Sequence, residues 1–161
     1  MKQLQRLLVC LPCVMILAAC ASGGGGGLSN RYTRDLGRHL VPTLEEARQK
    51  VWTKLNWDLQ REQVEYQNVL WESAWRPFTP PAGPAVSGPT DGRVRVIIRG
   101  RRMVEELDGG AQYRVSLDGE YEVIGGASSE WLPAPIPEEA EDAFDQIYSE
   151  LSLEIRTGVR R

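Results

Sequence analysis

The sequence predicts a two-layer α+β domain over residues 43–161, in which a curved antiparallel sheet of three to four strands carries two helices on one face. Three patterns predict this fold. Apolar residues recur at helical spacing within residues 43–55 and 137–157. Residues 62–76 and 93–124 alternate instead with a period of two, as half-buried strands do. Segments rich in proline and glycine separate these elements.

The first predicted helix covers about residues 43–55. Thr43 is the expected N-cap, because Glu46 stands three residues later and completes a capping box. We expect Asn56 to end the helix. The apolar stripe consists of Leu44, Ala47, Val51, Trp52 and Leu55.

Residues 62–76 predict a strand with tryptophan on its buried face. Val69, Trp71, Ser73 and Trp75 share that face. Packing in the core explains the two indoles. They are also a candidate ligand platform, so Trp71 and Trp75 are candidate site residues.

The segments on either side of this strand are less regular. In residues 57–62, Trp57 and Leu59 alternate with polar residues, which makes the stretch a candidate fourth strand. Residues 77–92 contain five prolines. Because proline cannot donate to a central ladder, we expect a loop there.

Residues 93–107 and 110–124 predict one long hairpin. The turn signals are Asp108-Gly109 and Asp118-Gly119. A turn at the second would mix apolar and acidic side chains on one face, which a half-buried sheet disfavours. We therefore place the turn at the first. Gly100 and Gly119 then lie within strands, where glycine marks a bend or a close approach of the backbone.

Arginines gather in the first strand of this hairpin. In the predicted register Arg95 lies opposite Glu122 and Arg99 opposite Asp118, so the cluster is explained as a neutralised outer face. The alternative is an anion or lipid-headgroup site at Arg95, Arg99 and Arg101. The full set is Arg93, Arg95, Arg99, Arg101 and Arg102.

The last predicted helix covers about residues 137–157. Pro137 suits the first helical position, and the acidic residues after it complement the positive end of the helix dipole. The apolar stripe consists of Ala140, Phe144, Ile147, Leu151 and Ile155.

Residues 1–19 are typical of a secretory signal peptide, with Lys2 and Arg6 before an apolar run. That run, residues 7–19, would span roughly 20 Å as a helix, too little for the ~30 Å hydrocarbon core of a bilayer. Residues 20–42 begin with a cysteine and soon reach five consecutive glycines. We expect them to form a flexible tether that holds the domain on the order of 25 Å from the membrane.

Leu17-Ala18-Ala19-Cys20 resembles the lipobox of bacterial lipoproteins. The resemblance implies cleavage between Ala19 and Cys20, and attachment of lipid to Cys20. It also implies sorting to the outer membrane, facing the periplasm, because Ala21 rather than aspartate follows the cysteine. The membrane is thus one expected partner, reached through the N-terminal lipid.

Composition argues against several function classes. The chain carries 19 basic and 22 acidic residues, a formal net charge of −3, whereas nucleic-acid binders usually show a basic excess. Cys10 and Cys13 lie inside the apolar run of the signal peptide, and His39 is the single histidine. We therefore expect no histidine-based triad, no metal site, no cofactor and no enzymatic activity.

The order of elements, with KLNWDL ending the first helix and WESAWRPF in the strand, is similar in topology to helix-grip domains of outer-membrane assembly lipoproteins. The anchor and this resemblance favour a non-enzymatic binding or envelope-assembly module with an envelope protein as partner. The alternative is a carrier or sensor of a small apolar or lipid ligand, held between sheet and helices near Trp71 and Trp75. A cavity there of about 300 Å³ or more would favour the carrier.

Overall fold

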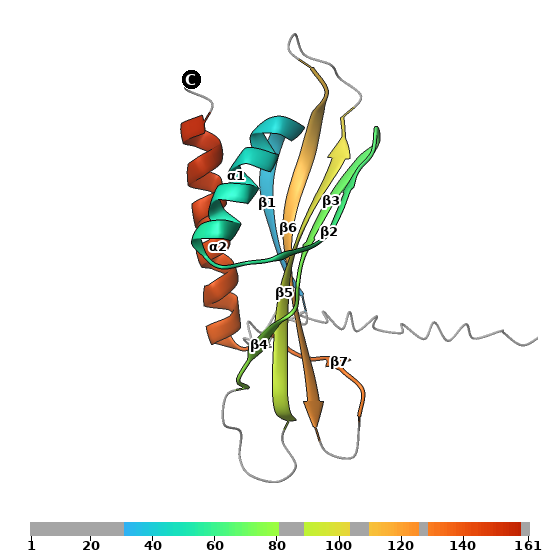
Figure 1. The fold of residues 1–161 in the computed structure, drawn as a ribbon, viewed down its shortest axis with the longest axis vertical. Helices are drawn as coiled ribbons and strands as arrows, with labels where there is room; N and C mark the ends of the chain where they lie inside the picture. Colours follow the sequence, from blue (N-terminus) through green and yellow to red (C-terminus); the bar gives the residue numbers. More distant parts are fainter. Residues whose placement is uncertain (1–30, 81–88, 104–109, 126–128, 159–161) are drawn as a thin grey trace, which may run out of the picture.

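The computed structural model describes residues 31–80, 89–103, 110–125 and 129–158. Both helices lie on one face of an antiparallel sheet, which confirms the predicted α+β class (Figure 1). The sheet has seven strands rather than three to four, in the order β1-β6-β5-β3-β2, with β4 beside β5 and β7 beside β6. The elements are β1 (Tyr32–Leu40), α1 (Val41–Lys54), β2 (Leu59–Val64), β3 (Asn68–Ser73), β4 (Arg76–Phe78), β5 (Pro89–Arg102), β6 (Gln112–Gly125), β7 (Leu132–Pro133) and α2 (Glu138–Gly158).

Strand β1 occupies residues that the sequence predicts to be tether, so the start of the domain at residue 43 is wrong. Tyr32 begins the strand, is 3% exposed, and packs its ring 5.2 Å from that of Phe144 between centroids. A bulge between Asp35 and Gly37 shifts the pairing of β1 with β6, and Gly37 takes a φ of 92°. The extra residue of the bulge breaks the alternation of inward and outward side chains in this mostly polar strand. The sequence of the strand therefore shows no regular period of two.

Helix α1 begins at Val41, earlier than predicted, and Leu40 at its N-cap makes no side-chain capping bond. Thr43 therefore lies inside the helix, and its predicted capping role is wrong. The chain passes directly from β1 into α1, and a proline in the first turn suits that start. At the other end, Asn56 follows the C-cap and takes a φ of 56°, in the left-handed region. Helix α2 occupies nearly the predicted residues, with the predicted side chains buried.

The strand predicted over residues 62–76 is divided among three strands. β2 and β3 form a hairpin, in which the Glu65 N–H donates to the Asn68 carbonyl oxygen at 2.8 Å. Ala74 leaves the ladder and donates its N–H to the Asp58 carbonyl oxygen at 2.8 Å, before the chain resumes as β4. β2 overlaps the candidate strand at residues 57–62, but it begins at Leu59 and leaves Trp57 outside the strand. The predicted loop at 77–92 is shorter than expected, because β4 and β5 extend into it.

Strands β5 and β6 form the predicted long hairpin, and residues 118–119 lie within β6 rather than at a turn. The register differs by two residues from the prediction, because Arg95 lies opposite Glu120 and Arg99 opposite Ser116. A shift by two keeps every side chain on its predicted face, so the apolar alternation does not distinguish the two registers. The predicted turn at 108–109 lies outside the described residues.

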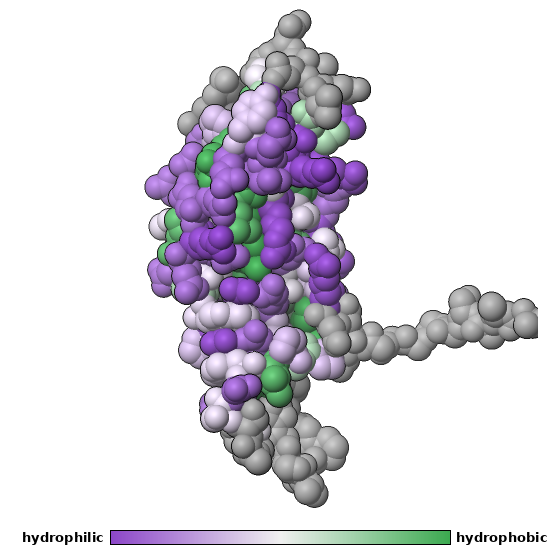
Figure 2. Space-filling model, turned by 90° about the vertical axis from the view of Figure 1, so that its right-hand side faces the viewer, coloured by the Kyte–Doolittle hydropathy of each residue, from purple (hydrophilic) through white to green (hydrophobic). Residues whose placement is uncertain are grey.

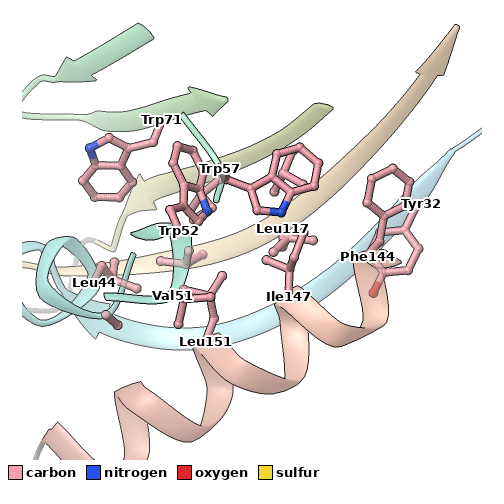
Figure 3. Packing of buried hydrophobic residues seen from close by; sticks show 14 of the residues in the cluster. Tyr32, Leu44, Val51, Trp52, Trp57, Trp71, Leu117, Phe144, Ile147 and Leu151 are labelled. Carbon is pink, nitrogen blue, oxygen red and sulfur yellow. The ribbon is translucent and has the colours of Figure 1, made fainter. Parts of the chain in front are cut away.

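The core lies between the sheet and the two helices (Figure 3). The rings and side chains of Trp52, Phe144, Ile147 and Leu151 are buried there. Gly119 approaches Phe144 so closely that an added Cβ would lie 2.5 Å from its ring. At Gly100, an added Cβ would lie 2.4 Å from Cγ2 of Val69. These contacts confirm the close approach predicted for the two glycines.

Candidate functional site

The outer face of the sheet is the face opposite the helices, and it carries the charged side chains of β5 and β6. The side of the molecule turned away from the helices is mainly hydrophilic, with apolar residues in a narrow band (Figure 2). Alternate residues of the two strands point to this face. They are Arg93, Arg95, Ile97, Arg99 and Arg101 of β5, and Arg114, Ser116, Asp118, Glu120 and Glu122 of β6.

One part of this face is neutralised by ion pairs. Arg95 Nε donates to Glu120 Oε2 at 2.7 Å. Arg99 pairs with Asp118, a carboxylate that is 3% exposed and also accepts a hydrogen bond from the Thr33 hydroxyl at 2.7 Å. Arg95 and Arg99, two of the three predicted anion-site residues, therefore already have carboxylate partners.

The candidate ligand platform is not assembled, because its two indoles lie on opposite faces. Trp71 is 0% exposed and belongs to the core. Trp75 is half-buried on the outer face, where its ring centroid lies 4.3 Å from the guanidinium carbon of Arg93 and 4.5 Å from that of Arg95. The break after β3 separates the two indoles. A second indole, that of Trp131, was not among the predicted site residues. Its ring centroid also lies 4.3 Å from the guanidinium carbon of Arg93.

Elsewhere on this face, three arginines lie directly opposite one another. Arg38 of β1 lies directly opposite Arg114 of β6, and Arg114 lies directly opposite Arg101 of β5. We call these three residues the arginine row. Neighbouring strands lie about 4.8 Å apart, so the three side chains leave the backbone within roughly 10 Å of one another. Like charges directly opposite each other destabilise a sheet.

Among the described residues, one carboxylate forms an ion pair with the arginine row. Arg114 donates a hydrogen bond to Asp35 Oδ2 at 2.9 Å, and this bond lowers the pKa of the Asp35 carboxyl from its ordinary value. Asp35 is therefore ionised at neutral pH. For Arg38 and Arg101, the described part of the chain shows no ion pair with a carboxylate. The row keeps a net positive charge among the described residues.

A groove of about 720 Å³ runs beside the arginine row. Its lining includes the arginine row and the Asp35 carboxylate, together with Arg102, whose guanidinium carbon lies 3.7 Å from the ring centroid of Tyr66. Hydroxyl and amide groups come from Thr33, Ser116 and Gln67, and Met103 adds an apolar side chain. A second groove, of about 410 Å³, shares Arg101, Arg114 and Ser116 with the first, and its lining also includes Glu65 and Arg99. This arrangement can bind an anion.

Sequence reasoning found Arg101 and missed its two companions for separate reasons. Arg38 lies in β1, which the sequence assigns to the tether. Arg114 faces Arg101 only in the observed register, since the predicted register places Ser116 there. Shifting the predicted pairing of the two strands by two residues would have placed Arg101 opposite Arg114 and revealed the like-charge pair.

Replacing Arg101 with glutamine should raise the free energy of unfolding by about 0.2–1 kcal/mol at low salt, because it removes a like charge from an exposed ladder position. Arg95→Gln is the matched control. It removes a paired arginine and should lower stability instead. Urea unfolding followed by circular dichroism measures both. A loss of stability in Arg101→Gln equal to that in Arg95→Gln would show that the row contributes to the fold.

Other kinds of site are not evident in the described part of the chain. Within it, no three of the histidine, aspartate and glutamate side chains gather closely enough to hold a metal ion. None of its helices has the length and apolarity needed to cross a bilayer. Ala19 and Cys20, the predicted cleavage and lipidation residues, lie outside the described residues. The chain matches no protein-family model and no curated protein sequence.

Proposed function

We propose that this chain is a non-enzymatic binding module, anchored at a membrane by lipid on Cys20, which binds an anionic component of the cell envelope through the arginine row. The row carries the proposal. It places like charges directly opposite one another on three strands, at the edge of a groove large enough for a ligand. A bound anion would supply the negative charge that no ion pair within the described residues gives to Arg38 and Arg101.

Packing supports a binding module over a carrier of an apolar ligand. Trp71 is fully buried, and the ring of Phe144 lies against the backbone of Gly119. Side chains fill the space between sheet and helices around Trp71 and Phe144. A hollow of about 370 Å³ between β1 and α2 is lined by neither Trp71 nor Trp75. The grooves beside the arginine row open instead on the outer face.

The domain begins earlier than predicted, which shortens the expected distance between the domain and the membrane. With β1 beginning at Tyr32, the predicted tether from Cys20 is about half as long as the sequence suggests. A flexible glycine-rich segment of that length has a mean reach on the order of 20 Å. The lipobox resemblance supports a position at the outer membrane, on its periplasmic side.

Cys20→Ala should release the chain from membranes without unfolding it, because the anchor and the described domain are separate segments. Fractionation of cells into membrane and soluble material checks the release, and circular dichroism checks the fold. Cys10→Ala serves as the control and should stay in the membrane fraction. Retention of Cys20→Ala in membranes would contradict the anchor.

Site-specific photocrosslinking in the native envelope tests the binding surface. A photoreactive residue at Gln67, which lines the groove, should yield a specific adduct. The same residue at Gln146, an exposed glutamine of α2, is the matched control and should yield none. Adducts at Gln146 alone would move the binding surface to the helices and contradict the proposal.

A further inference from the structure

We infer that the arginine row binds a phosphoryl group, carried either by a lipid headgroup or by a soluble phosphorylated ligand. The inference rests on the proposed function and specifies its ligand. It follows from the charge, the donors and the shape of the groove.

The charge of the row exceeds what one carboxylate neutralises. Asp35 already binds Arg114, and Arg38 and Arg101 add two further positive charges. A phosphate monoester carries about −1.5 to −2 charges at neutral pH, together with three strong acceptor oxygens. The planar guanidinium fork matches phosphate oxygens two at a time. One phosphoryl group can therefore accept from neighbouring arginines of the row at once.

The other polar groups near the row extend this set of donors. Asn68 of β3 lies directly opposite Arg101, so it continues the row onto a fourth strand with a side-chain amide. Ser116 and Gln67 line the groove beside it and supply a hydroxyl and an amide. These groups donate hydrogen bonds to phosphate oxygens without adding charge.

The shape of the groove accommodates more than the phosphoryl group itself. Its volume of about 720 Å³ exceeds that of an inorganic anion. Binding sites for small organic molecules are typically about 300–1,000 Å³. The half-buried side chain of Met103 offers an apolar surface to whatever the phosphoryl group is attached to. A phosphoryl group on a glycerol or similarly sized body fits this description.

The test uses the full lipidated chain anchored in phosphatidylcholine vesicles, titrated calorimetrically with inorganic pyrophosphate. We expect saturable binding that weakens as salt rises. In Arg38→Gln/Arg101→Gln the affinity should fall at least tenfold. Arg95→Gln, which removes an arginine already paired with Glu120 and lining neither groove, is the matched control and should stay within threefold of the unaltered chain.

A second titration, in vesicles that also contain phosphatidylglycerol, distinguishes the two sources of the phosphoryl group. If the ligand is a lipid headgroup, the anionic lipid competes and the apparent affinity for pyrophosphate falls. If the ligand is soluble, phosphatidylglycerol lowers the affinity no more than an equal surface charge of oleate, an anionic lipid without a phosphoryl group. Either result supports a phosphoryl site.

Two results would overturn the inference, an absence of pyrophosphate binding by the unaltered chain and binding unaffected by Arg38→Gln/Arg101→Gln. The first result includes the case of binding that arises only in Glu105→Gln/Glu106→Gln. That case would mean that the acidic residues following β5 in the sequence already occupy the row. In each case, persistence of the Gln67 crosslink would leave the proposed function standing with another ligand, and its absence would remove both.

Discussion

Replacing Trp71 with alanine is expected to lower the free energy of unfolding by about 3–5 kcal/mol. Its indole is fully buried in the core, and the Arg48 guanidinium carbon lies 5.5 Å from its ring centroid. The substitution removes this buried surface and leaves a cavity between the sheet and α1. Urea unfolding monitored by circular dichroism measures the loss.

Trp75→Ala is the matched control for this substitution, since it removes the same side chain at a half-buried position on the outer face. The contacts of Trp75 with Arg93 and Arg95 contribute about 0.5–1 kcal/mol each at such a site. We therefore expect a loss well below that of Trp71→Ala. Equal losses would contradict the placement of the two indoles on opposite faces, and an unchanged Trp71→Ala would return it to the role of ligand platform.

Replacing Gly119 with alanine is the second substitution with a large expected effect. The added Cβ would lie 2.5 Å from the buried ring of Phe144, a distance at which the helix or the strand must shift. Overpacking of this kind costs about 1–3 kcal/mol. Thermal unfolding should show the loss. Gly158→Ala, where nothing lies within 4 Å of the added atom, should be close to neutral.

A double-mutant cycle with Phe144→Leu tests the cause of this loss. The smaller side chain makes room for the new methyl group, so Gly119→Ala should cost less in the Phe144→Leu background. We expect a coupling of at least about 0.5 kcal/mol between the two substitutions. Strict additivity would show that the loss does not come from the contact between Gly119 and Phe144.

The elements with unbroken periodicity are those that the sequence predicts well. Helix α2 carries its apolar stripe from Ala140 to Ile155 without interruption, and its observed bounds nearly coincide with the predicted ones. Helix α1 is likewise predicted, although its first turn is not. The chain enters the helix directly from β1 and no side chain caps it, so the sequence carries no capping signal at the true start. The hairpin of β5 and β6 is predicted because the apolar residues of one strand lie opposite the apolar residues of the other.

The elements that the sequence misses are those in which a local irregularity disturbs the period. The bulge at Gly37 hides β1, and the departure of Ala74 from the ladder places Trp75 on the face opposite Trp71. The register is missed for another reason. Because side chains alternate with a period of two, a shift by two residues leaves every side chain on the same face, and the pattern cannot distinguish the two registers. The arginine row depends on both β1 and the register, so the candidate site emerged only from the three-dimensional structure.

The most direct test of the proposed binding surface is the yield of the Gln67 photocrosslink after the charge of the arginine row is removed. In Arg38→Gln/Arg101→Gln, we predict that the adduct is lost while membrane association through Cys20 is unchanged. In Arg95→Gln, whose arginine already pairs with Glu120 and lines neither groove, the adduct should persist. An undiminished adduct in Arg38→Gln/Arg101→Gln would contradict the proposal that the arginine row binds the partner.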